Sequence, residues 1–239
     1  MIALLQFRSD QSGWHEVKCI YDGMGVPYSQ YVILNMTSPF LNAELIIEIV
    51  KNAQGVILGG NGEGGYEETD PMKRKVFETV RLKTHRVLSV LEEREIPVFG
   101  TCFGHQIIAD YIGGTVEADK SQAETGIIPI TLTSQGRLDP IYSSFPGTFS
   151  AAEGHKSSVC TLPSEAIILA SSERCLIQSF RYRKMIGTQF HPEFNQQDLA
   201  DRLEMYPEYM ANSIKSGDED TELMVKRLLA NFRKSLYKG

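Results

Sequence analysis

A cysteine at position 102 has the surroundings of a nucleophile. It stands in Gly100-Thr-Cys102-Phe-Gly104, between the apolar strand-like segment 96–99 and a segment whose apolar residues recur with helical spacing. The two glycines allow a tight strand-to-helix turn without a clashing Cβ, and such a turn exposes the middle side chain above the edge of a sheet. The first N–H groups of the helix would favour the thiolate, which is the form that attacks. The pentapeptide alone is equally typical of a small buried cysteine.

A second candidate pair, His191 and Glu193, follows the last apolar segment. The two residues are separated only by Pro192, so their side chains project to the same side of an extended backbone that the proline restricts. A carboxylate beside an imidazole fixes its tautomer and stabilises the imidazolium that forms when the ring takes a thiol proton. Alone, the motif is more typical of a structural histidine in a proline turn. Together with Cys102 it indicates a base for a cysteine nucleophile.

The first half of the chain alternates apolar strand-like segments with helical ones. We expect strands at 2–7, 31–34, 54–58 and 96–99, and helices at 14–24, 41–52 and 70–95. This alternation is typical of a doubly wound α/β fold with a mostly parallel central sheet and helices on both faces. Ligands bind beyond the carboxyl ends of the strands in such sheets, so the glycine loop 59–65 and Cys102 should face one crevice.

The pattern changes after Gly114. Short strand candidates at 127–132, 147–150, 166–170, 176–180 and 185–190 are separated by turns, which predicts a mixed or antiparallel extension of the sheet. From residue 196 the chain becomes helical again. We therefore expect one catalytic domain at 1–195 and a C-terminal helical extension at 196–239 packed on the same domain.

Composition and charge narrow the class of protein. The 239 residues, 42% of them hydrophobic, can bury one full core. A net charge of −6 disfavours nucleic acid and anionic membranes as partners. No signal peptide or membrane span is recognisable. Cys19, Cys102, Cys160 and Cys175 lie far apart, without the clustering of a disulfide or zinc framework, so we expect a cytoplasmic protein with reduced thiols, no metal and no cofactor.

Two sequence blocks resemble the signatures of the class I (triad-type) glutamine amidotransferases, and the chain looks like a stand-alone amidotransferase domain similar to that of GMP synthase. The blocks are Gly100-Thr-Cys-Phe-Gly-His-Gln106 and Gly187-Thr-Gln-Phe-His-Pro-Glu193. Features between them agree in order and spacing: the residues 57–60, Glu124-Thr-Gly126, His155 and the residues 169–172. The resemblance covers about residues 45–195.

The resemblance implies a flavodoxin-like fold and a glutaminase reaction. Cys102 would attack the glutamine γ-carboxamide, His191 would act as base and then as acid, and Glu193 would orient His191. The γ-glutamyl thioester would form with release of ammonia to a separate synthase. The backbone N–H groups of Gly60 and Phe103 would bind the oxyanion. The residues implied to contact substrate are Gly59, Gln106, His155, Ser157 and Ser158. His105 lies near Cys102 but on the helix, where the geometry for proton abstraction is poor.

The chain also departs from the family pattern. Asn61 follows Gly59-Gly60 where proline is usual, and an acidic, glycine-rich stretch continues to Glu68. Lys156-Ser157-Ser158 stands where many members carry Gly-Asp, so an acid suited to the substrate α-ammonium is missing there. The segment after Glu193 is too short for a synthase domain. A γ-glutamyl peptidase or hydrolase that uses the same triad therefore remains the alternative, and a catalytically silent binding module is a third.

Overall fold

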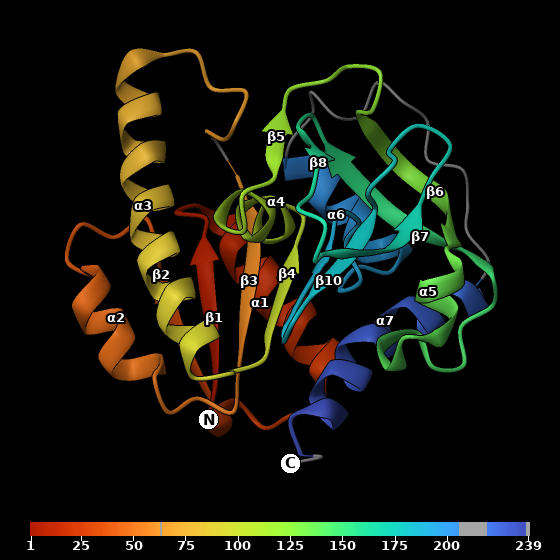
Figure 1. Cartoon of the computed structure of the whole chain (residues 1–239), viewed down its shortest axis with the longest axis horizontal. Helices are drawn as coiled ribbons and strands as arrows, with labels where there is room; N and C mark the ends of the chain where they lie inside the picture. Colours follow the sequence, from red (N-terminus) through yellow and green to blue (C-terminus); the bar gives the residue numbers. More distant parts are fainter. Residues whose placement is uncertain (63, 206–218, 238–239) are drawn as a thin grey trace.

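A computed structural model describes residues 1–62, 64–205 and 219–237 of the chain. Its centre is a nine-stranded sheet in the order β2-β1-β3-β4-β11-β10-β9-β6-β7 (Figure 1). The first five strands in this order are parallel. They are β1 (Ile2–Phe7), β2 (Tyr31–Asn35), β3 (Gly55–Asn61), β4 (Val98–Thr101) and β11 (Met185–Thr188). The parallel half follows the predicted alternation of strands and helices.

The other half of the sheet is antiparallel, as the second run of short strands predicts. It consists of β10 (Ser179–Tyr182), β9 (Ile167–Ser171), β6 (Glu124–Leu132) and β7 (Thr148–His155). The sequence analysis missed a separate two-stranded sheet of β5 (Thr115–Glu117) and β8 (Ser158–Thr161). It also missed a short helix, α5 (Ser134–Leu138), and two single turns, η1 (Tyr28–Gln30) and η2 (Pro140–Tyr142).

Helices cover both faces of the parallel half. One hydrophobic cluster joins the sheet to α2 (Ala43–Val50), α3 (Pro71–Glu93) and α4 (Phe103–Tyr111); another joins it to α1 (Gln11–Met24) and α7 (Glu219–Ser235). Along β1, Ala3 and Leu5 belong to the first cluster, whereas Ile2 and Leu4 belong to the second. Because side chains alternate across a strand, the fully apolar start of β1 requires cover on both sides. The predicted doubly wound class is confirmed.

The long helix α3 begins where its capping residues predict. The Asp70 carboxylate accepts hydrogen bonds from the backbone N–H groups of Met72 (2.9 Å) and Lys73 (3.0 Å), and Pro71 occupies the first helical position. Aspartate at the cap and proline directly after it stabilise the start of a helix, since both fit its unpaired N–H groups. This start fixes where the loop after β3 ends.

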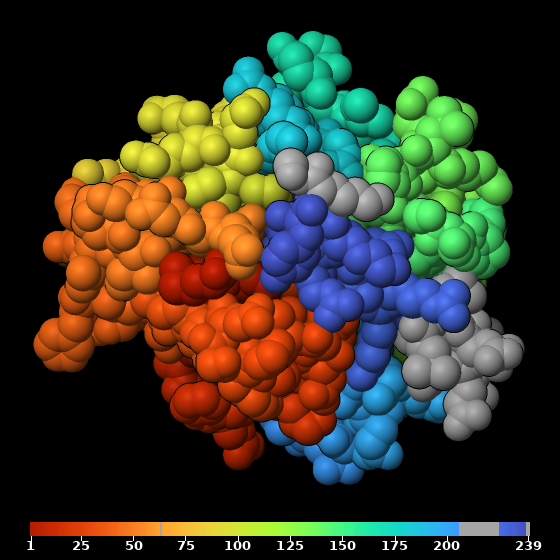
Figure 2. All heavy atoms as spheres, turned by 90° about the horizontal axis from the view of Figure 1, so that it is seen from below, coloured from red at the N-terminus to blue at the C-terminus, as the bar shows by residue number. Residues whose placement is uncertain are grey.

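The last helix, α7, packs between distant parts of the chain. Figure 2 shows it in dark blue, with red to orange N-terminal segments beside it and green segments of the antiparallel half on its other side. Phe232 contacts Phe99 of β4, with ring centroids 5.4 Å apart, and Asn231 donates to the Ile141 carbonyl at 2.9 Å. The shorter α6 (Gln196–Met205) packs against α1. The division at residue 195 stays a prediction. Among the described residues, no helix is long and apolar enough to cross a membrane.

We predict that Gly104→Ala destabilises the fold. A Cβ at position 104 would overlap the carbonyl of Leu58 in β3, so strand and helix would have to separate. We expect a loss of about 1–3 kcal/mol in the free energy of unfolding, measured by denaturant titration. Gly154→Ala is the matched control, since a Cβ there meets nothing within 4 Å. Equal losses in both variants would contradict the close-approach explanation.

Candidate active site

The turn between β4 and α4 holds Cys102 in a strained conformation. Its φ of 49° and ψ of −103° lie in a region that residues with a Cβ seldom adopt. Its backbone N–H donates to the Thr188 carbonyl of β11 at 2.8 Å, which ties the turn to the neighbouring strand. A Cβ at Gly100 would overlap the backbone of Gly104, so both glycines are needed for the tight crossing. The geometry is the strand-to-helix elbow that the pentapeptide predicts.

His191 and Glu193 lie beside this turn, just past the end of β11. His191 Nδ1 is 2.7 Å from Glu193 Oε1, and the His191 backbone N–H donates to the Ala152 carbonyl of β7 at 2.9 Å. The imidazole stacks on Phe194, with centroids 4.7 Å apart. Because Nδ1 faces the carboxylate, Nε2 is the ring nitrogen left for another partner, and the Cys102 sulfur is close enough to raise the pKa of His191. The three predicted triad residues are thus brought together.

The charges of the site favour a protonated histidine. Burial alone lowers the pKa of His191, but the nearby Glu193 carboxylate and the Cys102 sulfur outweigh it and raise that pKa. Burial would raise the pKa of Glu193, but the positive charge on His191 lowers it. The protonated imidazolium is therefore the favoured form of His191, held between the Glu193 carboxylate and the Cys102 sulfur.

The predicted oxyanion donor at Gly60 is occupied in this structure. The Gly60 N–H donates to Glu16 Oε1 at 2.8 Å, and the same oxygen lies 3.2 Å from Arg8 Nε. Gly60 lies close to His191, since a Cβ at position 60 would be 3.5 Å from His191 Cε1. A Cβ at Gly59 would overlap the Glu16 carboxylate, so this glycine makes room for Glu16. An oxyanion would have to compete with that carboxylate for Gly60. Phe103, the other predicted donor, is the first residue of α4.

A chain of amide side chains leads from the sulfur to the predicted substrate residues. Gln189 Nε2 lies 3.7 Å from Cys102 Sγ, and Gln189 Oε1 accepts from Gln106 Nε2 at 3.1 Å. Gln106 Nε2 also donates to the Ser157 carbonyl at 2.7 Å. Gln106 therefore lies near the elbow as expected. Sequence reasoning assigned no role to Gln189, although its place two residues before His191 puts it at the same strand end.

His155 and Ser158 form a buried network behind the site. His155 Nδ1 lies 3.1 Å from the Ser157 carbonyl and 3.2 Å from Ser158 Oγ, so Nδ1 carries the proton that the carbonyl accepts. Its Nε2 is 3.6 Å from Glu153 Oε2 and 3.8 Å from Glu124 Oε2. Burial and the nearby Glu124 raise the pKa of Glu153, which favours the neutral form of this carboxyl group. The sequence analysis missed Glu153, which neither motif includes.

The remaining cysteines and histidines have structural surroundings. His105 is fully buried against Phe180, with centroids 4.9 Å apart, and burial lowers its pKa to about 3. Burial also raises the pKa of the Cys19 and Cys175 thiols. These groups are therefore neutral and enclosed, as expected for core residues.

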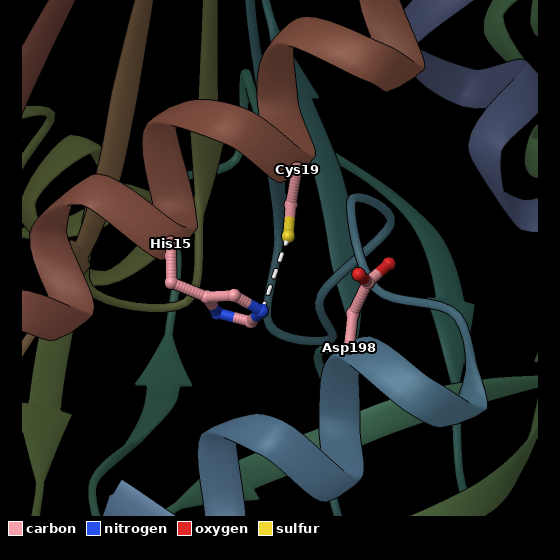
Figure 3. A group of neighbouring side chains, drawn as sticks. All are labelled: His15, Cys19 and Asp198. Carbon is pink, nitrogen blue, oxygen red and sulfur yellow. Dashed lines mark hydrogen bonds between the residues drawn. The ribbon is translucent and has the colours of Figure 1, made fainter.

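Two groups have the residue types of a metal site. In Figure 3, His15 and Cys19 project from α1 toward Asp198 of α6, with His15 Nε2 3.6 Å from the sulfur. Arg202 Nη2 donates to His15 Nδ1 at 3.0 Å, which leaves the imidazole proton on Nε2, and Lys226 pairs with Asp198 at 3.0 Å. We assign this group to packing between α1, α6 and α7.

The second group consists of Glu124, His155 and Cys175. Both oxygens of Glu124 accept from Ser172 Oγ, at 2.9 and 2.8 Å, and Oε2 accepts from Gln178 Nε2 at 2.8 Å. Burial raises the pKa of Cys175 to about 12, which keeps its thiol protonated. The Glu124 carboxylate is therefore already engaged with protein partners.

Cavities lie beside Cys102 rather than over it. A cavity of about 340 Å³ is lined by Arg8, Asn61, Phe77 and Phe103, among others, and a smaller one of about 50 Å³ is lined by Glu153 and His191. Cys102 lines neither of them and is only 6% exposed. Together, fold and side chains define an α/β protein in which a cysteine, a histidine and a glutamate gather at the end of the parallel strands.

Comparison with known proteins identifies the family. The profile for glutamine amidotransferase class-I matches residues 30–204, and the chain belongs to this family. The GMP synthase (glutamine-hydrolyzing) of Malacoplasma penetrans is 31% identical over 174 residues, covering 71% of this chain and 30% of that protein. One subunit of the GMP synthase (glutamine-hydrolyzing) of Methanopyrus kandleri is 26% identical over 181 residues, covering 75% of this chain and 82% of that protein. The chain thus spans less than a third of the first relative but most of the second.

Solved structures show the same fold. A glutamine amidotransferase from Thermotoga maritima has a TM-score of 0.73 at 21% identity, covering 100% of this chain and 99% of that one. A glutamine amidotransferase from Methylobacillus flagellatus has a TM-score of 0.70 at 18% identity, covering 100% and 94%. The architecture is therefore shared although the sequences have diverged.

We predict that Glu193→Gln lowers the pH at which His191 loses its proton. The substitution removes the charge that raises the pKa of His191, while burial continues to lower it, so the midpoint should fall by about 1–3 pH units. NMR titration of the imidazole measures the midpoint. Alkylation of Cys102 by iodoacetamide at neutral pH should slow in parallel, because the thiolate loses its counter-ion. Glu173→Gln, at an exposed site, is the control. An unchanged midpoint in Glu193→Gln would contradict the assigned pairing.

Proposed function

We propose that the chain catalyses the glutaminase half-reaction of an amidotransferase, with Cys102, His191 and Glu193 as its catalytic triad. The observation that carries this proposal is the buried pairing of His191 with Glu193 at 2.7 Å beside the strained elbow that presents Cys102. Membership of the class-I family supports glutamine as the substrate class.

The mechanism follows from the positions of these groups. The Cys102 thiolate attacks the γ-carboxamide carbon, and the resulting oxyanion is bound by the N–H groups of Phe103 and Gly60 once Glu16 has released Gly60. His191 then gives its proton to the leaving nitrogen, so ammonia departs and a γ-glutamyl thioester remains. The neutral imidazole takes a proton from water, whose attack releases glutamate and restores the thiolate. Glu193 stabilises each imidazolium state.

Ammonia is passed to a synthase on a separate polypeptide. The Methanopyrus kandleri relative is itself one subunit of a GMP synthase, and the present chain aligns with most of its length. A guanine-nucleotide synthase is therefore the first partner to test. The four cysteines are free thiols, which supports a cytoplasmic location.

A second candidate is hydrolysis of γ-glutamyl peptides or conjugates. The 340 Å³ cavity beside Phe103 has room for a leaving group larger than ammonia. The triad chemistry would be the same, with a larger amine accepting the proton from His191. The two candidates differ in the leaving group and not in the attack.

We predict that Cys102→Ala abolishes hydrolysis of every substrate in a panel of glutamine, γ-glutamyl dipeptides and asparagine. Loss of the nucleophile should lower kcat by at least about 10³-fold. Ammonia release and glutamate formation are measured with and without lysate from the source cell. The substrate with the highest kcat/KM in the wild type identifies the leaving group.

Cys160→Ala serves as the control, because Cys160 is a half-buried thiol outside the elbow. Wild-type activity in Cys160→Ala together with none in Cys102→Ala supports the proposal. Equal activity in Cys102→Ala and the wild type would refute the assigned nucleophile. A folded wild type that hydrolyses nothing, and whose Cys102 does not react with a glutamine-like electrophile, would favour the silent binding module.

A further inference from the structure

Glu67, in the acidic loop after β3, contacts the substrate end of the site. Ser157 Oγ donates to Glu67 Oε2 at 2.7 Å, although the two residues are 90 positions apart. Ser157 is buried, whereas Glu67 is exposed. The loop therefore brings a carboxylate to Ser157, the position at which the sequence itself carries no acid.

The position of Glu67 is fixed by its neighbour Tyr66. The Tyr66 ring packs edge-on against Phe77, with centroids 5.0 Å apart, and lies 6.1 Å from the ring of Phe103 at the elbow. Its hydroxyl group donates to Asp110 of α4 at 3.1 Å, and Arg74 donates to its carbonyl at 3.3 Å. The backbone next to Glu67 is thus attached to both α3 and the elbow helix.

Two amide side chains connect Ser157 to the sulfur of Cys102. The Ser157 carbonyl is linked to Cys102 Sγ through the side chains of Gln106 and Gln189, with separations of 2.7, 3.1 and 3.7 Å along the chain. In an extended glutamine, the amino nitrogen lies about 5 Å from the carboxamide carbon. A substrate whose carboxamide carbon is at the sulfur therefore presents its α-ammonium to residues that do not themselves touch the sulfur, and Ser157 is such a residue.

Glu67 differs from the other carboxylates around the site. Glu193 forms an ion pair with His191, and Glu16 forms one with Arg8. Glu153 is fully buried, and burial raises its pKa. Glu67 takes part in none of the ion pairs formed among the described residues, and its exposed side chain can meet a cation arriving from solvent.

We propose that Glu67 binds the α-ammonium group of the glutamyl substrate and that the Ser157 hydroxyl group orients it. This inference rests on the proposed function, because it assumes a γ-glutamyl group at Cys102. It assigns to the loop after β3 the selection of substrates that carry a free α-amino group. Glutamine and γ-glutamyl peptides both carry one, so Glu67 would select for the glutamyl part and not for the leaving group.

The test compares glutamine with 5-amino-5-oxopentanoate, which has the same carboxamide and carboxylate but no α-amino group. We expect Glu67→Gln to lower kcat/KM for glutamine by about 10- to 100-fold, chiefly through KM, since it removes one charge-assisted contact. Turnover of 5-amino-5-oxopentanoate should not change. A loss that is equal for both compounds would overturn the proposal, because a purely structural role of Glu67 affects both alike.

Two further variants sharpen the comparison. Glu68→Gln is the matched control, since Glu68 Oε1 accepts from the N–H groups of Thr69 and Asp70 and an amide oxygen can do the same. It should leave both compounds unaffected. Adding Ser157→Asp to Glu67→Gln should restore at least part of the preference for glutamine, since it returns a carboxylate to the same place. A preference that falls in Glu153→Gln but not in Glu67→Gln would assign the ammonium to Glu153 instead.

A labelling assay separates failure of this inference from failure of the proposed function. The inactivation rate of Cys102 is measured with 6-diazo-5-oxo-L-norleucine, which carries an α-ammonium, and with iodoacetamide, which does not. We expect Glu67→Gln to slow only the first reagent, by about 10-fold or more. If wild-type Cys102 reacts with the first reagent and Glu67→Gln does not alter the rate, the role of Glu67 is refuted while the nucleophile stands. If wild-type Cys102 reacts only with iodoacetamide, the proposed function itself fails and the inference with it.

Discussion

The close approach of β3, β4 and α4 is the constraint on which the rest of the structure depends. The backbone of Gly104 lies against the Leu58 carbonyl, and that of Gly100 lies against Gly104, with no room for a Cβ at either glycine. This contact forces the turn that holds Cys102 at a positive φ, and the hydrogen bond from Cys102 to Thr188 ties the turn to β11. Without it, the cysteine would be one more buried thiol in an α/β core. The position and backbone conformation of Cys102 therefore follow from the packing of the backbone around it.

The order of the strands brings His191 close to Cys102. β11 lies between parallel β4 and antiparallel β10, so the end of β11 is where the sheet changes from one type to the other. His191 lies three residues after the end of this strand, and its backbone N–H donates a hydrogen bond to the Ala152 carbonyl of β7. Two residues 89 positions apart thus meet because their strands are neighbours, and Glu193 follows within the same short segment. Ligands bind beyond the carboxyl ends of the strands in open α/β sheets, and Cys102 and His191 both follow such ends.

The sequence was informative where short spacing determines geometry. The elbow, the His191–Glu193 pair and the alternation of strands and helices could all be predicted, because each depends on residues close together in the chain. The small sheet of β5 and β8 could not, since its strands are short and largely lack an alternating apolar pattern. Contacts of Glu16 with Gly60 and of Glu67 with Ser157 join residues 44 and 90 positions apart, and no local pattern marks them.

The hydrogen bond from the Gly60 N–H to the Glu16 carboxylate has a consequence for the proposed hydrolysis of glutamine. A glutaminase that runs without an acceptor for ammonia wastes a nitrogen donor that other pathways need. Glu16 belongs to α1, which packs against the C-terminal helix α7. A displacement of α1 would therefore change the Glu16–Gly60 hydrogen bond and the packing against α7 together. If the Gly60 N–H binds the oxyanion, Glu16 must first move away from it, and any displacement of α1 would alter the rate of that step.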